Sequence, residues 1–383
     1  MNFMIVTDTF PPDINGVART LLILAQGLIH RGHRVNIVTT VTGEQNPPSL
    51  EVTRVRSLPV PGYESIRMGL ASRKAMEREI KKHQPDAMYV AVETPMGLSA
   101  IRGAARAGVG VVSGFHTNFH TYTTSYKLRL LGDLAARYLR WIHNRTRRTL
   151  APSEGTADQL RKLGVNNVGV LGRGVDAELF HPSRRDPALR KEWGADDSTP
   201  VALFVSRIAA EKNLPLAVRA FERLAQLNPG VRCIFVGDGP KSKWLRETYP
   251  QFVHAGLRTG EDLARHYASA DLFVFPSLSE TFGNVLIEAL ASGLVTVSFD
   301  YAAARQVVRQ GENGFVAAFG DEDAYLRVTS EALQHWNDAT LRQAARDAAR
   351  TLSWSAIVDL FEHELKQAAA AGTASQKLAA PFP

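Results

Sequence analysis

The chain has 383 residues and a mass of 42.0 kDa, a length beyond the size at which a single hydrophobic core usually stops growing. We therefore expect two domains, in a chain whose 45% hydrophobic and 22% charged residues are typical of a globular protein. The single cysteine, Cys233, excludes a disulfide within the chain and fits a reducing cytosol, and no run of about 18 apolar residues predicts a membrane span. The N-terminal segment MNFMIVTD lacks the basic start of a signal peptide, so we expect a cytoplasmic protein.

The charge is unevenly distributed along the chain. Residues 1–170 contain 22 Lys and Arg against 12 Asp and Glu, whereas the remaining residues contain 23 against 26. Residues 101–150 alone hold nine basic residues and one acid. The basic first half indicates an anionic partner, but the mildly acidic second half and the lack of a recognised reading motif disfavour nucleic acid.

The predicted elements alternate between apolar strands and amphipathic helices. In the first 40 residues, a strand over 1–8 is followed by a loop, a helix over 18–32 and a second strand over 34–40. Further buried strands are expected at 86–92, 109–115, 147–153, 201–206, 231–237, 271–277 and 294–300, with a helix over 214–227. A break near 171–200, rich in glycine, proline and charge, separates two such series. Short apolar strands between helices indicate two doubly wound α/β domains with ligands at the carboxyl ends of parallel strands.

Two glutamates eight residues apart, Glu280 and Glu288, flank the start of a helix that follows the strand at 271–277. Gly283 opens this helix, and the free N–H groups of its first turn form an anion site. One carboxylate can then hold a sugar on one side of a phosphate while the other holds a ribose on the far side. The pair therefore suits a nucleotide-sugar; the alternative is a capped helix with a solvated acid on its outer face.

Arg207 and Lys212 supply positive charge at the carboxyl end of the strand at 201–206. Two cations there can neutralise a diphosphate, Arg207 through its planar fork and Lys212 as a point charge. The alternative is a surface loop with ion pairs to Glu211.

Two loops of the first half contain further candidates. Gly16 lies in the loop after the first strand, where it permits close backbone approach to a phosphate or sugar; a turn that merely needs glycine is the alternative. No G-x-G-x-x-G follows that strand, so a dinucleotide site is not supported. His116 directly follows the strand at 109–115 and ranks above His120, because active-site loops cluster at strand ends; the alternative is a structural histidine.

The segment from Lys127 to Arg148 is predicted to be one amphipathic helix. Its apolar stripe includes Leu134 and Ile142, and the opposite side holds three arginines: Arg129, Arg140 and Arg147. Such a helix can lie on an anionic membrane surface. An ordinary core helix with a solvated cationic face is the alternative.

Together these segments resemble the family-4 retaining glycosyltransferases with the GT-B fold over nearly the whole chain. The resemblance rests on motifs in the family's order: FPPDINGVART, HTNFHTY, RGVDAELFHP, SRIAAEKN, GDGP and the glutamate pair. It implies two Rossmann-like domains facing each other across a cleft. The acceptor-binding domain would cover 1–172 with a last helix at 353–370, the donor-binding domain would cover 173–352, and 371–383 would be a loose tail.

The resemblance implies roles for single residues. Gly16 would pack against the donor, and His116 would contact the transferred sugar through its backbone or ring. Arg207 and Lys212 would stabilise the departing diphosphate, so that no metal or other cofactor is expected.

On the far side of the phosphate, Glu280 would bind sugar hydroxyls and Glu288 the ribose. Backbone N–H groups would come from Gly283, Asn284 and Val285. One departure concerns a turn where many members have a Gly-Gly pair and this chain has Tyr301 followed by three alanines.

The implied activity is retaining transfer of a hexosyl unit, mannose or glucose, from a nucleotide-sugar to a hydroxyl acceptor. The HTNFHTY run resembles that of bacterial α-mannosyltransferases and glycolipid synthases, which favours GDP-mannose over a UDP-sugar as donor. A glycolipid or lipid head group is the expected acceptor, reached by a cytoplasmic protein peripheral to the inner membrane face. The alternatives are a soluble sugar or polysaccharide acceptor, or a non-catalytic module that binds a nucleotide-sugar.

Overall fold

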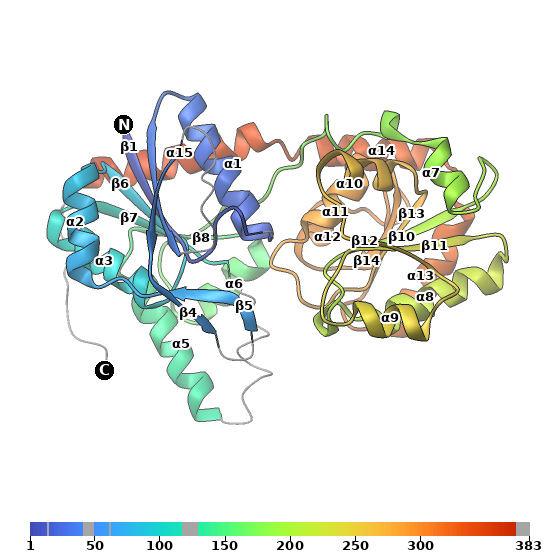
Figure 1. Cartoon of the computed structure of the whole chain (residues 1–383), viewed down its shortest axis with the longest axis horizontal. Coiled ribbons are helices and arrows are strands. Elements are labelled where there is room, and N and C mark those ends of the chain that lie inside the picture. The colour runs from blue at the N-terminus through green and yellow to red at the C-terminus, as the bar shows by residue number, and fades with distance from the viewer. Residues whose placement is uncertain (14, 41–49, 61–62, 117–128, 373–383) are drawn as a thin grey trace. The chain divides into compact units, whose positions relative to one another are not determined.

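The computed structural model describes residues 1–13, 15–40, 50–60, 63–116 and 129–372. The chain divides into two compact units, Met1–Arg173 with Trp354–Pro383, and Gly174–Ser353. These junctions differ by one residue from the predicted limits. Each unit contains a parallel sheet with helices around it, as the alternating pattern predicted (Figure 1).

The first unit has a seven-stranded parallel sheet in the order β3-β2-β1-β6-β7-β8-β9. Its strands are β1 (Asn2–Val6), β2 (Arg34–Thr40), β3 (Glu51–Val55), β6 (Ala87–Val90), β7 (Gly110–Gly114), β8 (Arg148–Ala151) and β9 (Val168–Val170). A separate antiparallel pair consists of β4 (Ser57–Val60) and β5 (Tyr63–Gly69).

The helices of the first unit are α1 (Gly16–His30), α2 (Arg73–His83), α3 (Pro95–Ala107), α5 (Arg129–His143), α6 (Glu154–Lys162) and α15 (Trp354–Ala371). Strand β1 shows why its residues form a continuous apolar run. Phe3 and Ile5 pack in a core with α1 and α15, whereas Met4 and Val6 pack in a second core with α2 and α3. Both faces of the strand are therefore buried.

Helix α15 returns from the far end of the sequence to complete the first unit, and Figure 1 shows it in red beside the blue α1. Val358, Phe361 and Ala368 on α15 are buried in the core shared with α1. A Cβ on Gly27 of α1 would lie 2.6 Å from the Val358 side chain, and one on Gly110 of β7 would lie 2.1 Å from the Ala368 carbonyl oxygen. Glycine at these two positions allows α15 to approach α1 and β7 this closely.

The second unit has a six-stranded parallel sheet in the order β12-β11-β10-β13-β14-β15. Its strands are β10 (Val201–Val205), β11 (Arg232–Val236), β12 (Val253–Gly256), β13 (Leu272–Phe275), β14 (Val295–Phe299) and β15 (Phe315–Ala317). Its α-helices are α7 (Pro187–Glu192), α8 (Leu214–Leu227), α9 (Ser242–Thr248), α10 (Gly260–Ala268), α11 (Asn284–Ala291), α12 (Ala302–Val307), α13 (Glu322–Gln334) and α14 (Ala339–Arg350). Every residue of β10, β13 and β14 is buried, which explains their uninterrupted apolar runs.

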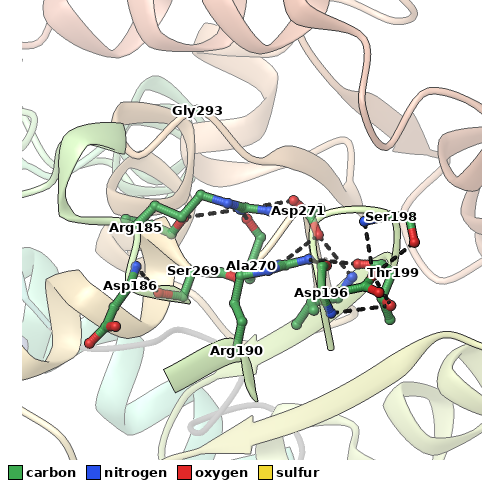
Figure 2. A network of polar contacts seen from close by, with 12 residues as sticks. Arg185, Asp186, Arg190, Asp196, Ser198, Thr199, Ser269, Ala270, Asp271 and Gly293 are labelled. Atoms are coloured by element: carbon green, nitrogen blue, oxygen red, sulfur yellow. Dashed lines mark hydrogen bonds and ion pairs between the residues drawn. The ribbon is translucent and has the colours of Figure 1, made fainter. Parts of the chain in front are cut away.

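A buried ion-pair cluster centred on Asp271 joins several of these elements (Figure 2). Asp271 is fully buried just before β13, and its Oδ2 accepts hydrogen bonds from Arg190 Nη1 at 3.1 Å and from the Val201 N–H at 3.0 Å. Arg185 and Arg342 reach the other oxygen at 3.0 and 3.2 Å. The cluster ties α7, β10, β13 and α14 together at the end of the sheet that lies opposite the carboxyl ends of the strands.

Candidate active site

The strand order of the second unit reverses between β10 and β13, and the loops that follow these neighbouring strands run side by side. In parallel α/β sheets, ligands bind at such a switch point beside the carboxyl ends of the strands. The loop after β10 contains Arg207 and Lys212, and the loop after β13 contains Glu280. The topology therefore brings together residues that are about 70 positions apart in the sequence.

Lys212 and Glu280 are in direct contact. Lys212 Nζ lies 2.5 Å from Glu280 Oε1, and Ser277 Oγ donates a hydrogen bond to the same oxygen at 2.8 Å. Both side chains are largely shielded, with 16% and 14% of their surface exposed. A cation and a carboxylate held side by side can serve a phosphate and an adjacent sugar hydroxyl at once.

Arg207 occupies a more open position in the same unit. Its Nη1 lies 3.8 Å from Glu211 Oε1, so the predicted alternative contact exists, but both side chains are nearly half exposed. Exposed pairs of this kind contribute little to stability. The guanidinium can therefore exchange Glu211 for a phosphate at low cost.

The GDGP segment explains how the Arg207 loop is shaped. Gly237 and Gly239 have φ values of 134° and 159°, and a Cβ on Gly237 would lie 1.9 Å from the Ser206 carbonyl oxygen. The Ile208 N–H donates to the Asp238 carbonyl at 3.0 Å. Only glycine lets these two loops approach so closely.

The N-terminus of α11 lies beside the Lys212–Glu280 contact. Gly283 caps it with φ at 100°, a left-handed conformation, and provides no side chain to accept from its first N–H groups. Asn284 and Val285 supply the first two of these groups, at the positive end of the helix dipole. This arrangement is typical of helix N-termini that bind anions, and the contact of these N–H groups with the donor stays a prediction.

Glu288 is buried rather than solvated, which rules out the alternative of an acid on the outer face of α11. Only 5% of Glu288 is exposed, and Tyr267 Oη donates to its Oε2 at 3.2 Å. The same hydroxyl lies 3.2 Å from the Val285 carbonyl oxygen. Tyr267 therefore fixes the orientation of the Glu288 carboxylate, a contact that no sequence pattern indicated.

Tyr301, which the sequence marked only as a departure from the family pattern, anchors the Glu280 loop. Its hydroxyl donates to the Ser277 carbonyl at 2.8 Å and accepts from the Glu280 N–H at 3.0 Å. The neighbouring Ala302 has φ at 50°, in the left-handed region that favours glycine. The tyrosine hydroxyl thus joins this turn to the Glu280 loop within the protein.

In the first unit, Gly16 is the first residue of α1. It is exposed and is not among the glycines with positive φ, so backbone strain does not demand glycine there. Asn15 caps the helix by accepting from the Val17 and Ala18 N–H groups at 3.1 and 2.9 Å. Without a side chain on Gly16, the start of α1 stays open to a ligand.

His116 follows β7 as predicted, but both of its ring nitrogens are occupied. Arg173 Nη2 donates to Nδ1 at 3.0 Å, and Nε2 lies 3.0 Å from Tyr89 Oη. Because a guanidinium only donates, Nδ1 is the acceptor, so Nε2 carries the proton and donates to Tyr89. Burial, aided by the charge of Arg173, lowers the pKa of His116 to about 3. Both ring nitrogens are therefore occupied, and of the two sugar contacts that the resemblance implies, through ring or backbone, only the backbone contact stays a prediction.

The predicted helix over 127–148 is shorter than expected, and Arg147 does not lie on it. The N–H groups of Arg145 and Thr146 bond to carbonyls three residues back, at 3.1 and 3.0 Å, which ends α5 at His143. Arg147 instead pairs with Val111 of β7 through its backbone. His120 and the side chain of Arg129 lie outside what the structure describes.

Part of the surface of α5 is exposed. Leu134, predicted on the apolar stripe, is 47% exposed, whereas Ile142 is buried. A hollow of about 630 Å³ next to the helix is lined by Asp133, Leu134, Ala136, Arg137, Arg140 and Leu163. The exposed leucine among arginines matches the pattern of an interfacial helix.

Among the residues that the structure describes, no group of three or more His, Cys, Asp or Glu side chains is arranged to hold a metal ion. No helix in this part of the chain is long and apolar enough to cross a membrane.

Comparison with known proteins gives matches along most of the chain. The family profile described as Glycosyltransferase Family 4 matches residues 14–179, and that described as Glycosyl transferases group 1 matches residues 185–351. A GDP-mannose-dependent alpha-mannosyltransferase from Corynebacterium glutamicum is 29% identical over 95% of this chain and 88% of its own length. A protein of the same name from Mycobacterium tuberculosis is 31% identical, with 93% of each chain covered.

Other similar proteins widen this group. An alpha-monoglucosyldiacylglycerol synthase from Streptococcus pneumoniae is 27% identical over 78% of this chain and 71% of its own. Among solved structures, Alr3699/HepE from Anabaena in complex with UDP has a TM-score of 0.76 at 20% identity, covering 96% of this chain and all of the other. At that identity the likeness concerns the fold.

Proposed function

This chain belongs to the family-4 glycosyltransferases with the GT-B fold, and we propose that it transfers a hexosyl unit from a nucleotide-sugar to a lipid-linked hydroxyl with retention. The observation that carries this proposal is the Lys212–Glu280 contact beside the open N-terminus of α11. It combines a cation, a carboxylate and the first N–H groups of a helix at one switch point. That set of groups suits a sugar joined to a diphosphate.

The transfer step follows from these groups. The bond between the anomeric carbon and the diphosphate oxygen breaks while the acceptor oxygen bonds to the same face of that carbon. The acceptor proton passes to the departing diphosphate, on which negative charge develops. Arg207, Lys212 and the N–H groups of α11 stabilise that charge, so the step requires no metal.

The two glutamates orient the donor instead of reacting with it. Glu280 binds sugar hydroxyls, and Glu288, held by Tyr267, binds the ribose. Neither carboxylate acts as a nucleophile, in contrast to retaining hydrolases in which two carboxyl groups lie about 5 Å apart.

The transfer assay uses two site variants and a matched control. Lys212→Ala and Glu280→Gln should each lower transfer at least about tenfold, whereas Lys243→Ala, which removes an exposed lysine paired with Glu247, should not. Binding of a nucleotide-sugar without turnover in the wild type would indicate a non-catalytic module. Full activity of both site variants would refute the assignment of the site.

For the donor we propose GDP-mannose, supported by the GDP-mannose-dependent relatives that match nearly the whole chain. A thermal-shift panel of GDP-, UDP- and ADP-sugars tests this, because a ligand that binds only the folded state raises its apparent stability. GDP-mannose should give the largest shift. A larger shift with a UDP-sugar would contradict this choice and support a UDP-sugar as the donor.

For the acceptor we propose a lipid at an anionic membrane surface, which α5 contacts from a peripheral position on the cytoplasmic side. The exposed Leu134, Arg137 and Arg140 support this. Arg140→Gln should weaken binding to anionic vesicles, whereas Arg223→Gln, which neutralises an exposed arginine of the second unit, should not. Equal binding of both variants, or transfer only to soluble sugars, would contradict the lipid acceptor.

A further inference from the structure

Arg173 is a buried arginine. It is the first residue of the RGVDAELFHP segment, but no role for it was apparent from the sequence. Only 5% of it is exposed, and burial lowers the pKa of its guanidinium to about 10. It donates to the Leu171 and Gly172 carbonyls at 2.9 and 3.0 Å, and to His116 Nδ1 at 3.0 Å. Within the part of the chain that the structure describes, all of these acceptors are neutral.

The contrast with Arg190 makes this arrangement informative. Arg190 is buried still more deeply, but it faces the carboxylate of Asp271, the usual way to compensate a buried charge. Within the residues that the structure describes, Arg173 contacts no such carboxylate, so its charge is a cost to folding that hydrogen bonds to neutral groups only partly offset. A cation retained under these conditions points to a role beyond stability.

The contacts continue from His116 into the core of the first unit. His116 Nε2 meets Tyr89 Oη, and the Tyr89 ring packs edge-on against Phe361 of α15, with ring centroids 4.8 Å apart. A Cβ on Gly114 would lie 2.0 Å from Tyr89 Oη and 2.6 Å from His116 Nε2, so glycine is needed at the end of β7. The imidazole is therefore held by Arg173 at Nδ1 and by Tyr89 at Nε2, and the missing side chain of Gly114 leaves room for both rings.

Arg173 is also the last residue of the first unit before the chain enters the second. Through the Leu171 and Gly172 carbonyls, its guanidinium fixes the segment that leads to this junction. Through Nδ1, it also fixes the His116 ring, two residues beyond the end of β7. One side chain thus joins the segment before the junction to the His116 ring.

We propose that Arg173 is a positioning residue for the transfer reaction, which holds the His116 ring as the neutral Nε2–H form and so places the His116 main chain against the transferred sugar. This inference rests on the proposed function, because it takes His116 as a sugar contact. It predicts that Arg173 affects binding of the sugar and leaves binding of the nucleoside diphosphate unchanged. The diphosphate is held by groups of the second unit.

The first test compares the affinities for GDP and for GDP-mannose by calorimetry, with kcat measured alongside. Arg173→Met should leave the Kd for GDP within about twofold, remove most of the added affinity that the mannose provides, and lower kcat about tenfold. Arg173→Lys, which keeps the charge without the planar fork, should give an intermediate result. Tyr89→Phe, which removes only one hydroxyl, should show a weaker effect of the same kind.

The matched control is Arg342→Met, which removes a mostly buried arginine from the Asp271 cluster in the second unit. It should lower thermal stability without changing the ratio of the two Kd values. If Arg173→Met leaves that ratio and kcat unchanged, or if Arg173→Lys equals the wild type, the positioning role is refuted. The same holds if Arg342→Met alters the ratio as much as Arg173→Met does.

A second measurement is made on the wild-type protein and does not depend on turnover; a variant serves only to assign the signal. Nitrogen NMR of the labelled wild type, assigned with His116→Gln, should show His116 as the neutral Nε2–H form throughout pH 5 to 8. A ring that titrates with an ordinary histidine pKa of about 6.5 would overturn the inference. A protein that transfers no sugar from any nucleotide-sugar would refute the proposed function, while this spectrum would still decide how Arg173 acts on His116.

Discussion

Asp8 lies just beyond β1, and its burial makes the ionised carboxylate a cost to the folded state. Its Oδ1 accepts from the Gly69 N–H at 3.0 Å, and only 9% of the residue is exposed. Burial raises the pKa of Asp8 from the ordinary 3.8 to about 6, and the nearby Glu93 adds to the increase. Asp8→Asn keeps an oxygen for Gly69 and removes the charge, so we expect a more stable protein at neutral pH.

The size of the gain depends on pH. A carboxyl group whose pKa is higher in the folded state stabilises it below the unfolded pKa, and that contribution is lost as the pH rises through the folded pKa. With values of 3.8 and about 6, the cost of ionising Asp8 is about 1.6 kcal/mol at pH 5 and about 3 kcal/mol at pH 8. The advantage of Asp8→Asn should therefore grow by about 1.4 kcal/mol between these pH values.

Scanning calorimetry at pH 5 and pH 8 measures this difference. For a unit of about 200 residues, the variant should melt about 3–6 °C higher at pH 5 and about 6–12 °C higher at pH 8. Asp133→Asn, which neutralises an exposed aspartate of the same unit, should show no such pH dependence. A gain of equal size at both pH values, or a loss at pH 8, would refute the reasoning.

Three further predictions concern the second unit. Tyr301→Phe removes the hydroxyl that holds the Glu280 loop, so transfer should fall about tenfold in an activity assay. The free energy of unfolding, measured by urea titration, should fall by about 1–3 kcal/mol. An unchanged transfer rate would mean that Tyr301 does not position Glu280. Asp271→Asn removes the charge on which three arginines converge, and urea unfolding should show a loss of about 3–5 kcal/mol; a loss under about 1 kcal/mol would contradict this account of the cluster. If Arg207 and Lys212 stabilise the departing diphosphate as proposed, transfer should continue in excess EDTA. Activity that returns only with a divalent ion would contradict the proposed metal-free step.

The strands that could be predicted from the sequence are those buried on both faces. The runs at 201–206 and 294–300 became β10 and β14 within one residue at each end, because fully buried parallel strands leave an uninterrupted apolar signal. Strand β3 has no fully buried residue, and β9 is only three residues long. Neither strand therefore leaves such an apolar signal in the sequence. The end of α5 was also missed, because the turn at Arg145 and Thr146 depends on backbone bonds that the charge pattern does not encode.

Where the residues of the candidate site lie in the fold was easier to predict than which side chains they contact. Arg207 and His116 directly follow strands, so their place at the carboxyl end of a sheet follows from the fold class. The contacts themselves join distant residues: Lys212 meets Glu280 across 68 positions, and Arg173 meets His116 across 57. No local spacing encodes such pairs, because they depend on strand order.

The return of α15 to the first unit has a consequence for how the chain folds as it is synthesised. Domains near the N-terminus usually fold first on the ribosome. Here the core of the first unit lacks Val358, Phe361 and Leu365 until α15 has been made, and α15 follows the whole of the second unit, Gly174–Ser353, which is continuous. The second unit can therefore complete its core first, and the first unit stays exposed to chaperones and proteases until α15 leaves the ribosome.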